Sequence, residues 1–263
     1  MLPVKTVSQK QISIDFHLDI YNRLLSQYES LTDFLENLKS FNTNLAKNKT
    51  LYDINPYPDP IEQGIYILGT FDSELGIFPQ PRLALKCSLG KILTENLRKQ
   101  FDRSIQLTQE IETKFNVAEK HLLQICPVYL HVQIKSKNSV FKQILFMEWI
   151  GGETLGSSDG LSEEFCRVFN IPSLEEIRRK PQFALHLHLD RNKKRQLLKI
   201  QTAYLFKRLW QKGIRILSLN QKNILISKNP ETGQNQYIII DPVSNFYLPL
   251  SPLYNTFTSM LCT

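Results

Sequence analysis

The chain is poor in glycine, which supplies 10 of its 263 residues. It also lacks long apolar runs: stretches such as 144–150 are the size of a strand, which excludes a membrane span. Charged residues interrupt the first twenty positions, which excludes a secretory signal. Its four cysteines lie far apart without a CxxC pair and indicate buried or free thiols in a reducing, cytoplasmic compartment. The remaining composition, 42% hydrophobic and 22% charged, is that of a globular protein.

The net charge of +7 is concentrated in one part of the chain. The window from Arg178 to Arg215 holds twelve Lys or Arg and one acid, Asp190. Such a stripe can face nucleic acid, an acidic partner protein or an anionic membrane surface, or it can be the solvated face of a helix. The candidate nucleic-acid contacts share one helical stretch, and they are Lys193, Lys194, Arg195 and Lys199.

The hydrophobic pattern predicts a helical N-terminal extension followed by alternating short strands and helices. Apolar residues between Ile20 and Leu38 recur at helical spacing, and three prolines in 56–60 end this region. The elements expected after the prolines are a hairpin of strands 65–71 and 82–86, one or two helices over 91–125, strands 128–135 and 141–147, a helix over 191–211, and a hairpin of strands 223–226 and 236–240.

This order, with the residues at its corners, resembles the protein-kinase-like fold. Residues 64–67 and 83–86 are similar to the exit of the kinase Gly-rich loop and the V-A-I-K strand. Residues 146–155, read F-M-E-W-I-G-G-E-T-L, resemble the strand, gatekeeper and hinge, where backbone groups of an extended linker bind the adenine edge. The strand ending at Asp241 resembles the one that leads into D-F-G, with Pro-Val in place of Phe-Gly.

The resemblance implies a two-lobed α+β fold with an antiparallel-sheet N-lobe and a shortened helical C-lobe. We expect a helical extension over 1–54, an N-lobe over 55–146, and the hinge and C-lobe over 147–263. A polar insert of the C-lobe is expected at about 156–190. Only 22 residues follow Asp241, fewer than an activation segment and the peptide-binding helices of protein kinases need.

The same resemblance implies an ATP and magnesium site. Lys86 is expected to contact the nucleotide phosphates, and Glu119 is expected to hold Lys86, with Glu110 and Glu112 as alternatives. Asn223 and Asp241 offer the hard oxygen ligands that Mg²⁺ prefers. The other residues expected to bind nucleotide are Gly64, Met147, Glu148 and Ile150.

The catalytic loop departs from the kinase pattern at the residue that performs the chemistry. Ser218 occupies the position of the catalytic aspartate, and a serine hydroxyl is not basic near neutral pH without a neighbouring base. The Gly-rich loop retains only Gly64. These departures favour a pseudokinase with a regulatory or scaffolding role and a protein partner.

Two other functions stay open at this point. An active atypical kinase needs a base from the insert, for which Asp159, Asp190, His186 and His188 are the candidates. A binding module would use the basic 178–215 stretch to hold nucleic acid or an acidic partner, with the kinase frame as its scaffold.

Overall fold

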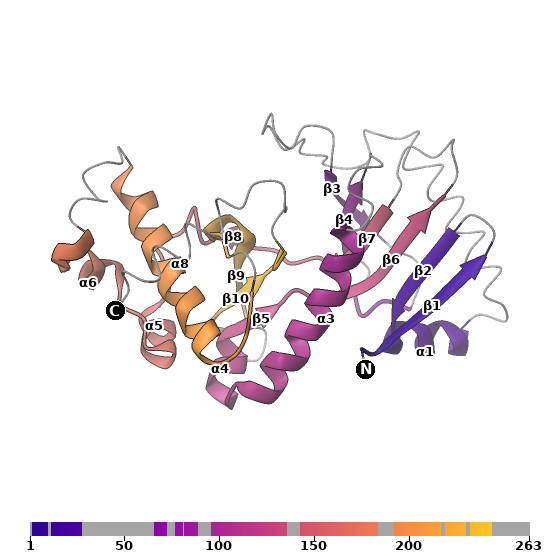
Figure 1. Cartoon of the computed structure of the whole chain (residues 1–263), viewed down its shortest axis with the longest axis horizontal. Coiled ribbons are helices and arrows are strands. Elements are labelled where there is room, and N and C mark those ends of the chain that lie inside the picture. The colour runs from indigo at the N-terminus through magenta and orange to yellow at the C-terminus, as the bar shows by residue number, and fades with distance from the viewer. Residues whose placement is uncertain are drawn as a thin grey trace. The chain divides into compact units, whose positions relative to one another are not determined.

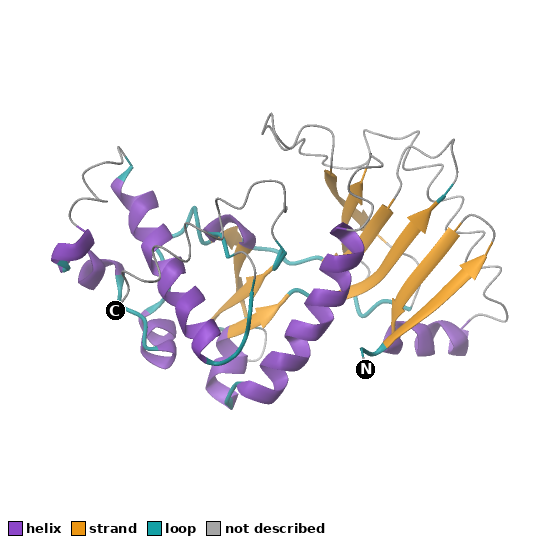
Figure 2. Ribbon diagram, viewed as in Figure 1, coloured by secondary structure: helices purple, strands orange, loops and turns teal. Residues whose placement is uncertain are grey.

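Two sheets and their flanking helices form the structure, a computed structural model that describes residues 2–9, 12–27, 66–72, 77–80, 82–88, 96–135, 143–183, 192–216, 219–229 and 232–243 (Figure 1). The chain divides into two compact units. Unit 1 comprises Met1–Ile105 and Pro127–Trp149, and unit 2 comprises Gln106–Cys126 and Ile150–Thr263. Mixed α and β structure is present in both (Figure 2).

A six-stranded antiparallel sheet organises unit 1. Its spatial order is β1-β2-β6-β7-β4-β3. The strands are β1 (Val4–Gln9), β2 (Ile12–His17), β3 (Tyr66–Asp72), β4 (Arg82–Ser88), β6 (Val128–Ile134) and β7 (Gln143–Glu148). The hairpin predicted around residues 65–86 and the next two predicted strands are confirmed within a few residues of their expected ends.

The two faces of this sheet differ because side chains alternate along each strand. One face is apolar and packs against helix α1 (Leu18–Gln27) through Ile20 and Leu24. Its strand residues include Ile14, Phe16, Leu83, Leu85, Leu130, Val132, Ile144 and Phe146. The other face carries polar side chains that bond to the first half of helix α3 (Asn96–Lys114).

The prediction of a helical extension over 1–54 is wrong for its first part. Residues 4–9 and 12–17 form a hairpin, and only 18–27 form a helix. Ile12, Ile14 and Phe16 alternate with polar residues, so burial on one face of a sheet satisfies them better than a helix does. Residues 28–54 lie outside the part of the chain that the structure describes.

Unit 2 combines a small sheet with helices. Its four strands are ordered β5-β10-β9-β8, with β5 (Leu123–Ile125) parallel to β10 (Asn235–Ile239) and the other pairs antiparallel. The remaining strands are β8 (Glu153–Thr154) and β9 (Ile224–Lys228). The helices are α4 (Val117–Leu122), α5 (Glu163–Phe169), α6 (Leu174–Arg179) and α8 (Lys193–Gln211), with 3₁₀ turns at Pro181–Phe183 and Gln221–Asn223.

Helix α8 lies at the centre of the core of unit 2. Eleven of its residues are buried, and its apolar side chains pack with those of α5, β5 and β10. Tyr237 of β10 is fully buried beside Phe165, and its hydroxyl accepts a hydrogen bond from the Ser162 amide at 2.7 Å. The predicted helix over 191–211 and the predicted 223–240 hairpin are confirmed, whereas β5 lies where the sequence predicted a helix.

Three cysteines test the thiol prediction, which is confirmed for them. Cys87, Cys126 and Cys166 are buried, and none of the three forms a disulfide. Burial raises the pKa of the Cys87 thiol to about 12 and that of Cys166 to about 11, so both stay protonated and unreactive near neutral pH. Cys262 lies outside the described residues.

The paired glycines 151 and 152 provide a test of how tightly unit 2 is packed. A Cβ on Gly152 would lie 2.1 Å from the carbonyl oxygen of Ile226, and the φ of 150° is strained for other residues. A Cβ on Gly151 would meet nothing within 4 Å. We predict that Gly152→Ala lowers the free energy of unfolding by about 2 kcal/mol or more and that Gly151→Ala leaves it within about 0.5 kcal/mol.

The measurement is urea unfolding followed by the fluorescence of Trp210 in a Trp149→Phe background, so that unit 2 alone is observed. Equal midpoints for the two alanine variants would contradict the close approach of Gly152 to β9.

Candidate functional site

Lys86, the predicted phosphate ligand, is a buried cation on the polar face of the unit 1 sheet. Its side chain is 9% exposed. The ammonium donates a hydrogen bond of 2.9 Å to Oε1 of Gln100, which lies in the second turn of α3. Gln100 in turn directs its Nε2 toward the Met147 sulfur at 3.9 Å. Helix α3, β4 and the end of β7 therefore meet around one lysine.

The predicted hinge begins where β7 ends. Strand β7 pairs with β4, so that Met147 lies opposite Ala84 and Glu148 opposite Leu83. The Glu148 amide donates to the Pro127 carbonyl oxygen at 2.9 Å. Past it, the Trp149 ring lies under the Arg82 guanidinium, with 4.9 Å between the guanidinium carbon and the ring centroid. Ile150 follows as a half-buried residue of unit 2.

The Glu148 carboxyl is enclosed by two donors of unit 1. Gln80 Nε2 donates to Oε1 at 2.5 Å, and the Tyr129 hydroxyl donates to Oε2 at 3.2 Å. Burial raises the pKa of Glu148 above its ordinary value, and the hydrogen bonds from Tyr129 and Gln80 offset part of this rise. The side chain and amide of Glu148 are thus both engaged within unit 1.

The raised pKa of Glu148 predicts a stability change of known sign. The folded state holds this proton more tightly than the unfolded chain, so the stability of unit 1 should decrease as pH rises from 4.5 through the folded pKa. Glu148→Gln should remove this decrease. The test is urea unfolding across pH 4–8, followed by Trp149 fluorescence in a Trp210→Phe background, with exposed Glu153→Gln as the control. A wild-type pH profile in Glu148→Gln would contradict the assignment.

Asn223 and Asp241, the predicted metal ligands, lie at the same end of the β9–β10 hairpin. Asn223 immediately precedes β9 and Asp241 follows the end of β10 by two residues. The Ile240 amide donates to the Asn223 carbonyl oxygen at 2.9 Å and joins the two segments there. Both side chains are half-buried. Within the described residues, no three His, Cys, Asp or Glu side chains form a metal-ligating group.

An amide oxygen and one carboxylate fit magnesium that is bound together with phosphate. Mg²⁺ is usually held through one or two carboxylates and the phosphates of its substrate, and it retains several waters. Asn223 and Asp241 provide hard oxygen atoms of this kind at adjacent backbone positions. Such a pair is too small a ligand set to bind the metal tightly by itself.

Glu119 makes its described contacts within unit 2. It lies in α4, where its carboxylate accepts from the Asn116 amide at 3.0 Å and forms an ion pair of 2.6 Å with Lys212. The Asn116 side chain accepts from the Glu119 amide, which completes a capping box. The predicted pair of Lys86 with Glu119 would join residues of different units and stays a prediction. The contacts described are those of Lys86 with Gln100 and of Glu119 with Lys212.

The two alternative glutamates also have other partners. Glu110 lies 3.8 Å from Lys114, and Glu112 lies 2.8 Å from Lys120. Both fall in the half of α3 that belongs to unit 2. Sequence periodicity missed Gln100 because it shows only that a stretch is helical, and the residue of α3 that meets β4 depends on long-range packing.

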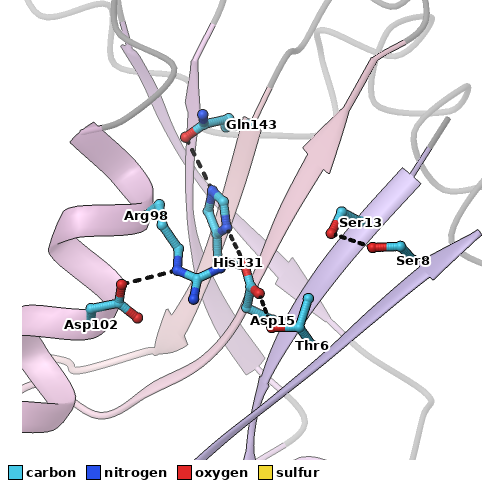
Figure 3. Close-up of polar contacts among 8 residues, drawn as sticks. All are labelled: Thr6, Ser8, Ser13, Asp15, Arg98, Asp102, His131 and Gln143. Atoms are coloured by element: carbon cyan, nitrogen blue, oxygen red, sulfur yellow. Dashed lines mark hydrogen bonds and ion pairs between the residues drawn. The ribbon is translucent and has the colours of Figure 1, made fainter. Parts of the chain in front are cut away.

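A second group of polar residues links the unit 1 sheet to helix α3 (Figure 3). Asp15 of β2, 2% exposed, accepts from Thr6 Oγ1 at 2.7 Å and forms an ion pair with Arg98 of α3. Nδ1 of His131 lies 3.0 Å from the Asp15 carboxylate. Two further contacts extend the group: His131 Nε2 with Gln143 Oε1 at 3.1 Å, and Arg98 Nε with Asp102 Oδ2 at 3.0 Å.

The pKa of Asp15 predicts how unit 1 responds to acid. Burial by itself raises this pKa, but hydrogen bonds from His131 and Thr6 and the charge of Arg98 bring it below the ordinary 3.8. The ionised carboxylate therefore stabilises unit 1 above pH 3.8, and this contribution is lost as pH falls through the folded pKa. The unfolding free energy of Asp15→Asn should depend less on pH below 5 than that of wild type.

Asp19→Asn is the matched control, because Asp19 is exposed on α1 a few residues away. The measurement is acid unfolding followed by the fluorescence of Trp149, with Trp210→Phe present in every variant. The same loss of stability between pH 5 and pH 2 in wild type and Asp15→Asn would contradict the prediction.

Several predicted residues lie outside the described part of the chain, among them Gly64, Ser218, His186, His188 and Asp190. Asp159 is exposed and pairs with Lys194 at 2.8 Å. Lys193 and Arg195 are exposed and Lys199 is half-buried on α8, so their contact with nucleic acid stays a prediction. No helix in the described residues is long and apolar enough to cross a membrane.

Comparison with known proteins gives no family. No protein-family profile matches the sequence, and a search of curated proteins found no match. Among solved structures, one of an apo pseudokinase aligns with a TM-score of 0.29 at 8% identity, over 68% of this chain and 54% of that one. The chain thus spans about half the length of that structure. A match with this TM-score is too weak to assign function.

Proposed function

We propose that the chain is a kinase-like pseudoenzyme that binds ATP with magnesium and has lost efficient phosphoryl transfer. The observation that carries the proposal is the bond between Lys86 and Gln100. It joins a lysine in a sheet strand to the helix that follows that strand in the chain, beside the strand that leads into residues 147–150. In protein kinases, a strand lysine held by the next helix contacts the nucleotide phosphates.

The helix partner of Lys86 supports binding without efficient transfer. Kinases use a glutamate at this place, and the ion pair must form for activity. Gln100 orients the ammonium through a neutral amide, which itself carries no charge. A positioned cation attracts phosphate. Ser218 at the aspartate position replaces a group on which transfer depends.

The proposal assigns a separate role to each unit. In unit 1, Lys86 would contact the phosphates. In unit 2, Asn223 and Asp241 would hold the metal, which neutralises phosphate charge when it is bound. The regulatory or scaffolding role follows because a nucleotide that is bound and not consumed can stabilise one conformation of its host.

Thermal unfolding with and without ATP and magnesium tests the proposal. A ligand that binds only the folded state raises its stability by about 2.7 kcal/mol at 100 times its Kd. We predict a rise in Tm for wild type that is lost in Lys86→Met and reduced in Asp241→Asn. The controls are Lys135→Met and Asp159→Asn, which change exposed residues of the same charge in the same units.

Two outcomes would contradict the account. A wild-type Tm that saturating ATP and magnesium do not move would refute nucleotide binding. Release or transfer of the γ-phosphate that Asp241→Asn abolishes would refute the loss of transfer and would establish an active atypical kinase.

A further inference from the structure

One row of residues crosses the unit 1 sheet from its N-terminal hairpin to Lys86. The strand registers place Thr6 opposite Asp15, Asp15 opposite His131, His131 opposite Leu145, and Leu145 opposite Lys86. Directly opposed residues point to the same face of a sheet. The hairpin carboxylate and the lysine therefore belong to one face, with β6 and β7 between them.

Helix α3 contacts this row of residues at two places, Asp15 and Lys86. Arg98 forms an ion pair with Asp15, and Gln100 accepts the hydrogen bond from Lys86. Phe101 of the same helix lies beside His131 of the row, with 6.4 Å between the two ring centroids. Residues two apart on a helix point to nearly opposite sides, so Arg98 and Gln100 reach toward different strands. Rotation of α3 about its axis would therefore disturb both contacts together.

Burial makes the contact between Asp15 of the hairpin and Arg98 of α3 specific. Asp15 and His131 are both nearly inaccessible to water. An ionised carboxylate in such a place requires its partners, because its hydration has been removed. Arg98 is therefore drawn to one position, which fixes the first turns of α3 relative to β2.

We propose that the N-terminal hairpin is a positioning element for Lys86. Asp15, acting through Arg98, sets the rotation of α3 that keeps Gln100 on the lysine. Asp15 and Arg98 are positioning residues and need not touch a ligand themselves. The consequence for nucleotide affinity rests on the proposed function, whereas the coupling between Asp15 and the surroundings of Lys86 does not.

The decisive variant is Arg98→Gln, since it removes the link from the hairpin to α3 and leaves the contacts of Asp15 with Thr6 and His131 in place. Asp15→Asn tests the same link from the hairpin side. Ser13→Ala is the matched control, because among the residues that the structure describes its hydroxyl bonds to Ser8 alone, at an exposed place of the hairpin (Figure 3). Gln100→Ala gives the response expected when Lys86 loses its helix partner directly.

Two readouts require no nucleotide. They are amide hydrogen exchange of peptides covering 97–105 and the rate at which a small neutral acylating reagent modifies Lys86, both read by mass spectrometry. We expect Arg98→Gln and Asp15→Asn to raise both rates by about 5- to 30-fold, which corresponds to the loss of one or two kcal/mol of local stability. Ser13→Ala should match wild type, and Gln100→Ala should raise Lys86 acylation without loosening the hairpin.

Unchanged exchange of α3 and unchanged acylation of Lys86 in Arg98→Gln would overturn the proposal. If Asp15→Asn does not fold, Arg98→Gln decides alone. Arg98 is partly exposed, and in this variant the buried carboxylate of Asp15 still has Thr6 and His131 as partners. A third readout, ATP affinity, should fall in both variants. Absence of ATP binding in wild type would refute the proposed function and would leave the first two readouts as a complete test of the positioning role.

Discussion

The structure of unit 1 depends on the need of buried polar groups for partners. Its sheet has an apolar face that any well-packed helix could cover, and a polar face on which Asp15, His131 and Lys86 are nearly removed from water. The free-energy cost of removing these groups from water is offset only by hydrogen-bond donors and acceptors in fixed places. Helix α3 provides Arg98 and Gln100 at those places. The same requirement that stabilises the unit therefore fixes the position of the helix beside the candidate phosphate ligand.

Local contacts within unit 2 account for the positions of Glu119, Asn223 and Asp241. Glu119 is committed to the capping of α4 and to Lys212, so it serves the local fold of that unit. Asn223 and Asp241 remain together because the β9–β10 hairpin brings its two ends to one point, a placement that depends on strand pairing and not on catalysis. Strand pairing and helix capping thus explain where these residues lie, and ligand binding is the test of whether they form a site.

Sequence reasoning located most elements and few of their contacts. The strands around Lys86 and the long helix α8 were predicted from alternation and helical spacing, which are local properties. The first hairpin was missed although Ile12, Ile14 and Phe16 alternate, because β2 is completed by β6, more than a hundred residues away. Gln100 and Arg98 could not be found for a related reason: the face of α3 that meets the sheet is chosen by burial of charge, which no single segment encodes.

The central claim is that Lys86 is held in position to meet nucleotide phosphates. An acyl-phosphate derivative of ATP transfers its acyl group to a lysine that lies beside the bound phosphates, and peptide mass spectrometry identifies that lysine. The account predicts modification of Lys86 that excess ATP with magnesium suppresses. Modification spread over exposed lysines such as Lys193 and Lys222, with Lys86 unlabelled and no effect of ATP, would contradict it.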